Sequence, residues 1–273
     1  MSKENNITKG KITGIIANLI VVEADGPVQQ NEICYIVQQD SRLMSEVIKI
    51  MGKTAYIQAF ESTRGLKVGD IVEFTGHMLE VNLGPGILSR NYDGLQNDLD
   101  KMDGIFLKRG AQTDALDHDK KYEFKPIAKE GDKVIAGDWV GEVTENWLPH
   151  KIMVPFKLKG KYTVKSVARE GEYTVDDTMA VITDEDGNEI EVTMVQQWPV
   201  KVPIKNYQEK PRPFKLLETG IRIIDTLNPI GEGGTGFIPG PFGSGKTVLQ
   251  HALSKQAEAD MIIMAACGER ANE

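Results

Sequence analysis

The sequence predicts a multidomain protein with an N-terminal antiparallel β-barrel, a β-rich insert domain of sandwich or hybrid type, and the start of an α/β domain. Three observations support this prediction. Short apolar segments separated by turn residues fill residues 1–76, Gly-Asp and Gly-Glu turns recur within 111–200, and a glycine-rich loop precedes a helical pattern within 201–273. Residues 77–110 are expected to connect the barrel to the α/β domain.

The composition is acidic and typical of a soluble protein. Lys plus Arg number 32 against 40 for Asp plus Glu, which gives a net charge of -8 and a pI near 5.2. A free-standing nucleic-acid binder usually has a basic face and a high pI, so nucleic acid is not an expected partner. With only Cys34 and Cys267, a disulfide scaffold is excluded and a reducing compartment is favoured.

The N-terminal end and the hydropathy pattern bear on localisation. Residues 1–10 are polar and lack the apolar core of a signal peptide. No apolar run approaches the roughly 18 residues needed to cross a bilayer. We therefore expect a cytoplasmic protein, or one bound peripherally to the cytoplasmic face of a membrane.

Residues 1–76 have the pattern of short strands. Apolar runs at 12–16, 19–22, 34–37 and 47–50 alternate with turn signals such as Asp25-Gly26-Pro27. A small antiparallel barrel is the most economical packing for strands so short and so closely spaced. No chemistry is apparent here, which indicates a structural or assembly role.

The next two segments are rich in turns. Gly84-Pro85-Gly86 and Asp93-Gly94 force a defined path on the connection. Residues 131–143 have the rhythm of a small sandwich whose short strands alternate between two sheets. A modified-lysine hairpin at Lys151 is the weaker alternative, because His150 precedes the lysine where such hairpins have Met.

One motif indicates chemistry. It matches a phosphate-binding loop (P-loop), with two glycines five positions apart followed by Lys and Ser or Thr, of which about 0.02 are expected by chance in this chain. A possible strand at 236–239 precedes it, and apolar residues at helical spacing follow. The nucleotide-binding residues expected are Gly240, Pro241, Phe242, Gly243, Ser244, Gly245, Lys246 and Thr247.

Each residue type in the motif has a physical reason. The glycines let backbone N–H groups converge on phosphate oxygens, and the following helix directs its positive end at them. Lys246 supplies a positive charge, and the Thr247 hydroxyl is a ligand for Mg²⁺. ATP or ADP with Mg²⁺ is the implied ligand.

A second candidate lies beyond the helix. Residues 260–266 are almost wholly apolar, as in a buried strand of a parallel sheet, and Cys267-Gly268-Glu269-Arg270 follow. Ligands bind outside the carboxyl ends of such strands, so Glu269 is placed to orient and deprotonate an attacking water. The alternative is a surface Glu–Arg pair at a strand end.

These motifs resemble the catalytic A (alpha) subunit of V-type and archaeal A-type rotary ATPases. The Pro241-Phe242 pair inside the loop separates this branch from its relatives, and 267–270 resemble the family's catalytic glutamate motif. The resemblance continues along the chain at Glu61-Ser62-Thr63, 83–86, 92–96, 149–155, Thr219-Gly220 and 224–227.

The resemblance implies a cytoplasmic, membrane-peripheral subunit. Three A subunits alternate with three B subunits in an A3B3 ring, with central and peripheral stalk subunits and a membrane ion-translocating sector. ATP hydrolysis or synthesis is coupled there to H⁺ or Na⁺ transport. By position, Gly240 to Thr247 bind the nucleotide, Lys246 and Glu269 are catalytic, and Arg270 positions Glu269 or meets the neighbouring subunit.

Two features depart from the family pattern. Ala266 and Ala271 stand where family members usually have Gly, and a Cβ at Ala271 forbids positive φ, which would place the loop carrying Glu269 differently. Family chains are also roughly twice as long, so we expect the first part of such a subunit, as a fragment or a truncated product.

Two alternatives remain open. A truncated chain could be a catalytically inactive relic of the subunit that binds ATP weakly or not at all. A ring-forming, nucleic-acid-dependent ATPase also joins a small barrel to this core, although the low pI disfavours it.

Overall fold

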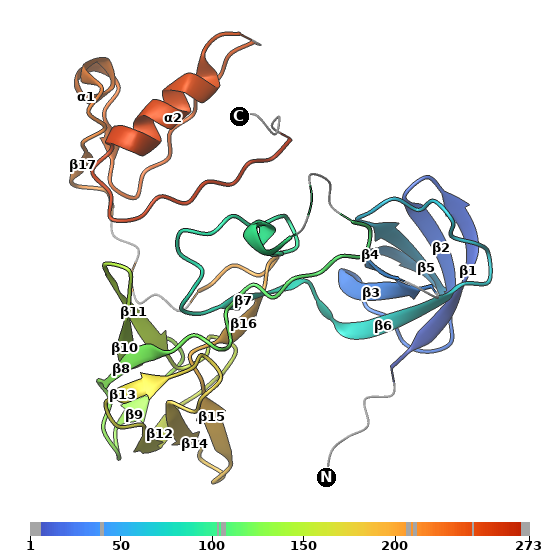
Figure 1. Ribbon diagram of the computed structural model, residues 1–273, viewed down its shortest axis with the longest axis horizontal. Helices are drawn as coiled ribbons and strands as arrows, with labels where there is room; N and C mark the ends of the chain where they lie inside the picture. Colours follow the sequence, from blue (N-terminus) through green and yellow to red (C-terminus); the bar gives the residue numbers. More distant parts are fainter. Residues whose placement is uncertain are drawn as a thin grey trace. The chain divides into compact units, whose positions relative to one another are not determined.

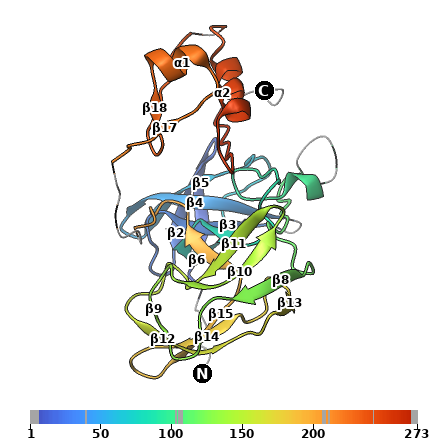
Figure 2. The same cartoon turned by 90° about the vertical axis from the view of Figure 1, so that its left-hand side faces the viewer.

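The computed structural model describes residues 7–38, 41–102, 104, 108–205, 209, 212–241 and 243–268. The chain forms two compact units, Met1–Asn206 and Tyr207–Glu273. Figures 1 and 2 show the barrel and the β-rich domain of the first unit and the two helices of the second. Among the described residues, no helix has both the length and the apolar character that crossing a membrane requires.

The N-terminal domain is a closed antiparallel barrel, as predicted. Its strands close in the order β1-β2-β5-β4-β3-β6 (Figure 1), and every pair is antiparallel. The strand bounds are β1 Lys9–Ile16, β2 Leu19–Ala24, β3 Glu32–Val37, β4 Arg42–Met51, β5 Thr54–Ala59 and β6 Ile71–Met78.

Alternation of side chains explains the barrel. Ile20, Val22 and Ala24 on β2 all face the core, while the residues between them face outward or lie at the surface. Gly52, at φ +62°, forms the tight turn between β4 and β5. The interior is almost wholly apolar, with the small buried Ser45 between Leu43 and Val47 on β4, so the barrel is a packed core.

The connection contributes to a sheet. Strand β7 (Glu80–Leu83) pairs antiparallel with β16 (Gln196–Pro199), and a single 3₁₀ turn, η1, covers Leu99–Lys101. This pairing joins the connection to the end of the insert, although more than a hundred residues separate the partner strands in sequence. The segment is therefore tied into the first unit by hydrogen bonds.

The insert is a sandwich of two four-stranded sheets, as predicted. The sheet orders are β11-β10-β8-β13 and β15-β14-β12-β9. Two apolar clusters form its core, one around Phe124 and Ile152 and the other around Val164 and Ile182. The strand bounds are β8 Tyr122–Pro126, β9 Lys133–Val134, β10 Trp139–Glu145, β11 Leu148–Met153, β12 Tyr162–Val167, β13 Gly171–Tyr173, β14 Ala180–Thr183 and β15 Glu189–Val192.

The described part of the second unit contains two short strands and two helices. Its elements are β17 Leu216–Leu217, α1 Arg222–Leu227, β18 Ile230–Gly231 and α2 Lys246–Gln256. Gly220, at φ +72°, makes the turn between β17 and the start of α1.

The two strands predicted to flank the loop and its helix were wrong for this structure. Residues 236–239 and 260–266 have no regular structure, and Phe237 and Ile263 are largely exposed. A buried parallel strand needs neighbours on both edges, and no described residues pair with either segment. The apolar pattern is present in the sequence, but the described residues form no parallel sheet for it to join.

Candidate functional site

The predicted phosphate-binding loop leads directly into helix α2. Gly245, at φ +81°, is the residue before the helix, and Gly243 has φ +79°. Both values lie in the left-handed region that residues with a Cβ rarely adopt. The glycines of the motif are therefore required by the backbone path.

The loop is held closed by its own hydrogen bonds. The Ser244 hydroxyl donates to the Pro241 carbonyl at 2.8 Å, and the Ser244 N–H donates to the same oxygen at 3.3 Å. A Cβ placed on Gly240 would lie 2.4 Å from the Ser244 Oγ atom. Glycine at this position lets the Ser244 side chain approach the backbone closely.

Lys246 is the first residue of α2, and its ammonium lies back over the loop. The Nζ atom donates to the Gly240 carbonyl at 2.5 Å, and the residue is exposed. Thr247 follows on the first turn and is half-buried. A lysine whose ammonium donates to a neutral backbone carbonyl can exchange that partner for an anionic oxygen, which is the stronger acceptor.

The start of α2 also presents backbone donors. The first N–H groups of a helix have no partner within the helix, and the dipole adds partial positive charge at the same end. The glycine-rich loop, the adjacent lysine and the helix start thus supply donors and positive charge at one place. They fit a polyphosphate group, with the Thr247 hydroxyl available to a divalent cation that accompanies it.

Three predicted site residues lie outside the described residues. Phe242, within the loop, and Glu269 and Arg270, after the apolar segment, have no described geometry. Their roles stay predictions. Gly268, just before Glu269, has φ +71°, so the chain turns sharply where the catalytic carboxylate is expected.

A turn that the sequence did not single out for function braces the loop helix. The Thr219 hydroxyl, which is fully buried, donates to Asp225 Oδ1 at 2.6 Å and lowers the pKa of that carboxyl. The next residue, Gly220, packs against Gln256 at the end of α2, and the Glu258 N–H donates to the Glu218 carbonyl at 3.0 Å. The Thr-Gly pair before a helix with Asp on its first turn was the available sequence signal.

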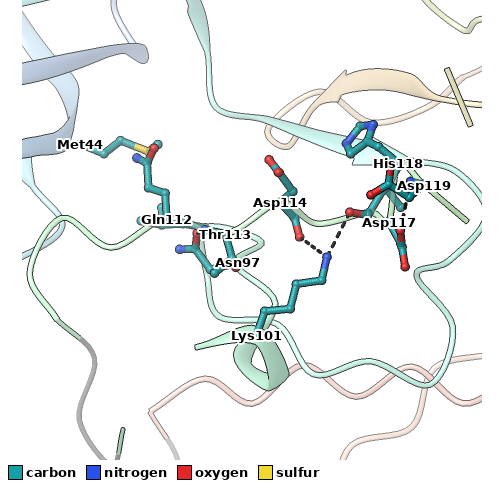
Figure 3. A pocket seen from close by; sticks show the side chains of 11 residues that line it. Met44, Asn97, Lys101, Gln112, Thr113, Asp114, Asp117, His118 and Asp119 are labelled. Atoms are coloured by element: carbon teal, nitrogen blue, oxygen red, sulfur yellow. Dashed lines mark hydrogen bonds between the residues drawn. The ribbon is translucent and has the colours of Figure 1, made fainter. Parts of the chain in front are cut away.

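The first unit has polar cavities that no motif indicated. One of about 610 Å³ lies between Met44 and the segment 112–119 (Figure 3), where the Lys101 ammonium donates to the carbonyls of Asp114 and Leu116 at 3.1 Å each. Several acidic residues line it, but no group of three or more His, Cys, Asp or Glu side chains in the described part of the chain could hold a metal ion. This cavity is not a candidate metal centre.

Comparisons with known proteins identify the family of this sequence. Three family models match in order, all for ATP synthase alpha/beta subunits. The beta-barrel domain matches residues 12–76, the barrel-sandwich domain matches 113–201, and the nucleotide-binding domain matches 220–273. The chain belongs to the ATP synthase alpha/beta family. The P-loop described above falls inside the match to the family's nucleotide-binding domain.

Individual family members are similar along almost the whole chain. The V-type ATP synthase alpha chain of Treponema denticola is 52% identical over 269 residues, which is 97% of this chain and 46% of the relative. The alpha chains of Borrelia garinii and Borreliella burgdorferi are each 47% identical over 269 residues, again 97% of this chain and 47% of the relative. The chain therefore spans about half the length of the curated relatives it matches, and these relatives confirm the V-type branch predicted from the Pro-Phe pair.

Proposed function

We propose that this chain acts as part of the catalytic, ATP-binding alpha subunit of a V-type ATP synthase. The observation that carries the proposal is the P-loop geometry at 240–247, inside a segment that matches the family's nucleotide-binding domain. In this function Gly240 to Gly245 hold the phosphate chain against the start of α2, and Lys246 transfers its hydrogen bond from the Gly240 carbonyl to a phosphate oxygen.

The remaining roles follow from residue type and position. Thr247 binds Mg²⁺, which supplies charge neutralisation at the β- and γ-phosphates when bound. Glu269 accepts a proton from the attacking water and holds it in line, and Arg270 positions Glu269 or contacts the neighbouring subunit. The turn formed by Thr219 and Asp225 holds the end of α2 in place through the contacts of Gly220 with Gln256 and of Glu218 with Glu258.

The partners and the location belong to the proposal as well. The subunit alternates with B subunits in an A3B3 ring, contacts central and peripheral stalk subunits, and couples ATP hydrolysis or synthesis to H⁺ or Na⁺ movement through a membrane sector. It lies on the cytoplasmic face of that membrane. The similarity to the V-type alpha chains named above supports this assignment.

A chimera tests the proposal directly. This sequence replaces the aligned residues of the Treponema denticola alpha chain, which is 52% identical to it, and the assembled complex is assayed for Mg²⁺-dependent ATP hydrolysis. We expect turnover in the chimera, loss of nucleotide binding with Lys246→Ala, and retained binding without turnover with Glu269→Gln. Normal turnover of the Glu269→Gln complex would remove the proposed role of that carboxylate.

A further inference from the structure

A second polar cavity in the first unit has an unusual set of uncommitted donors. It has a volume of about 560 Å³ and lies where the segment 86–90, the loop 115–120 and the turn after β10 meet. None of the predicted site residues lies in it. The side chains that matter below are Arg90, Lys120, Tyr122, Glu145 and Trp147.

The carboxylate in the cavity wall has its acceptors filled. Glu145 Oε1 accepts the Gly86 N–H at 2.6 Å and the Leu88 N–H at 3.0 Å, and Oε2 contacts His150 Nδ1 at 2.8 Å. The residue is 3% exposed. Glu145 is therefore engaged in holding the segment 86–88, and it has little capacity left to pair with the cations of the cavity.

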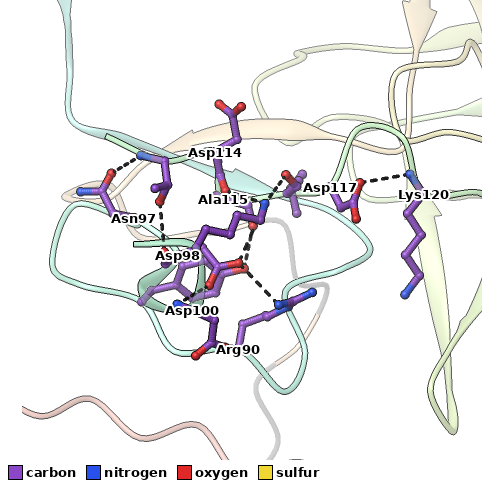
Figure 4. A network of polar contacts seen from close by, with 12 residues as sticks. Arg90, Asn97, Asp98, Asp100, Asp114, Ala115, Asp117 and Lys120 are labelled. Atoms are coloured by element: carbon purple, nitrogen blue, oxygen red, sulfur yellow. Dashed lines mark hydrogen bonds and ion pairs between the residues drawn. The ribbon is translucent and has the colours of Figure 1, made fainter. Parts of the chain in front are cut away.

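Two of those cations keep free donors. The Arg90 guanidinium contacts Asp98 Oδ2 only at 3.7 Å (Figure 4), and its side chain donates no hydrogen bond to a described residue. The Lys120 ammonium lies 4.9 Å from the centre of the Tyr122 ring and forms no ion pair within the described part of the chain. A guanidinium offers a planar fork of donors, and an ammonium offers a mobile point charge.

The Tyr122 hydroxyl adds a third donor without a partner. It is buried and has no hydrogen-bond partner among the described residues. Burial, followed by the nearby Glu145 charge, raises the pKa of Tyr122 to about 12, so the phenol stays protonated and can donate. A buried hydroxyl without a partner is rare and costly in a native structure, which indicates an occupant close to it.

The other carboxylates of the wall are partly neutralised. Asp117 Oδ1 accepts the backbone N–H groups of Asp119 and Lys120, and Asp98 Oδ1 accepts that of Asp100 (Figure 4). Asp98 Oδ2 faces Arg90 and, at 3.9 Å, Lys101. The three cations of the wall balance its three carboxylates in formal charge. The Arg90 guanidinium, the Lys120 ammonium and the Tyr122 hydroxyl each lack a hydrogen bond to a described residue, and their complement is a ligand rich in acceptor oxygens.

We propose that this cavity binds a phosphate group, carried by inorganic phosphate or by a phosphate ester. The Arg90 fork and the Lys120 ammonium hold the phosphate oxygens, and the Tyr122 hydroxyl donates from the wall. The volume exceeds that of one phosphate, and exposed Trp147 at its edge suits an attached apolar or aromatic group. The site lies in the first unit, so it acts independently of the P-loop.

Calorimetric titration of the full chain tests the proposal. Lys246→Ala is introduced first to remove phosphate binding at the P-loop, and inorganic phosphate and phenyl phosphate are the two probes. We expect saturable binding of at least one probe in the millimolar range. Arg90→Gln should weaken it by about tenfold or more and Tyr122→Phe by about fivefold, as expected for a charge-assisted and a neutral hydrogen bond. Tighter binding of phenyl phosphate would identify an ester as the ligand class.

Two controls make the proposal falsifiable. Lys165→Gln removes an equivalent exposed charge elsewhere on the sandwich, where Lys165 pairs with Glu189, and should leave binding unchanged. Without phosphate, Tyr122→Phe should keep or raise the melting temperature, because the hydroxyl has no partner to lose. The proposal is overturned by the absence of saturable binding, by equal weakening in Lys165→Gln, or by a lowered melting temperature in Tyr122→Phe.

Discussion

Glu145 is the side chain on which the link between the insert and the preceding segment most depends. It is 3% exposed and accepts two backbone N–H groups 57 and 59 residues away in sequence. A hydrogen bond to a charged group contributes about 1.5–3 kcal/mol. Gly86 and Leu88 are half-buried, so water partly replaces the lost acceptor, and the lower figure applies to each bond. Glu145→Ala should therefore reduce the free energy of unfolding by about 3 kcal/mol.

A graded series separates this effect from general damage. Glu145→Gln keeps one oxygen for both N–H groups but loses the charge and places an amide nitrogen opposite His150 Nδ1, so about 1 kcal/mol should be lost. Glu130→Ala, at an exposed turn of the same domain, is the matched control and should stay near wild type. Urea unfolding followed by tryptophan fluorescence suits the measurement, because Trp139, Trp147 and Trp198 all lie in the first unit. A loss below about 1 kcal/mol in Glu145→Ala would show that the carboxylate does not hold the segment.

Three further predictions follow from the same structure. Burial opposes ionisation of Glu145, but the hydrogen bonds from His150, Leu88 and Gly86 outweigh it and lower its pKa below the ordinary 4.5. The ionised Glu145 therefore contributes fully to stability above the pKa of this carboxyl in the unfolded chain, and the contribution is lost as the pH falls through its lower pKa in the folded chain. The difference in urea midpoint between wild type and Glu145→Gln should accordingly shrink on acidification. Gly141→Ala should lower the free energy of unfolding by at least about 3 kcal/mol, since the new Cβ would lie 2.2 Å from buried Phe124. Gly14→Ala, with its nearest contact at 3.6 Å, should lower it far less. Equal denaturation midpoints for the two variants would contradict this prediction. A thiol reagent should label exposed Cys267 quickly and Cys34 only on unfolding, because Cys34 is buried and burial raises its pKa. Rapid labelling of both thiols in the native protein would refute the barrel packing.

The two β-domains were predictable because residues close together in the sequence determine most of their strands and turns. Each hairpin is encoded by alternating apolar residues and a turn, as at Gly52, and neighbouring strands in sequence pair often enough to suggest a barrel and a sandwich. The pairing of β7 with β16 was not predictable, because nothing in either short strand identifies a partner more than a hundred residues away.

Of the two candidate sites, one could be predicted from the sequence and the other could not. The P-loop follows from its motif, because its residue types and spacing specify a backbone shape, and the φ angles of Gly243 and Gly245 have that shape. The donor-rich cavity around Tyr122 could not be predicted, since it is formed by segments that only the fold brings together. The strands expected at 236–239 and 260–266 failed because a parallel strand depends on its neighbours as much as on its own sequence.

The central claim is that the loop at 240–247 binds the phosphates of a nucleotide, and fluorescence titration of the full chain with a fluorescent ATP analogue and Mg²⁺ tests it most directly. The account predicts weak but saturable binding that Lys246→Ala reduces at least about tenfold, as expected for loss of a charge-assisted hydrogen bond. Lys255→Ala, at the other end of α2, should bind like wild type. Equal binding by wild type and Lys246→Ala would contradict the account, because the nucleotide would then be held elsewhere.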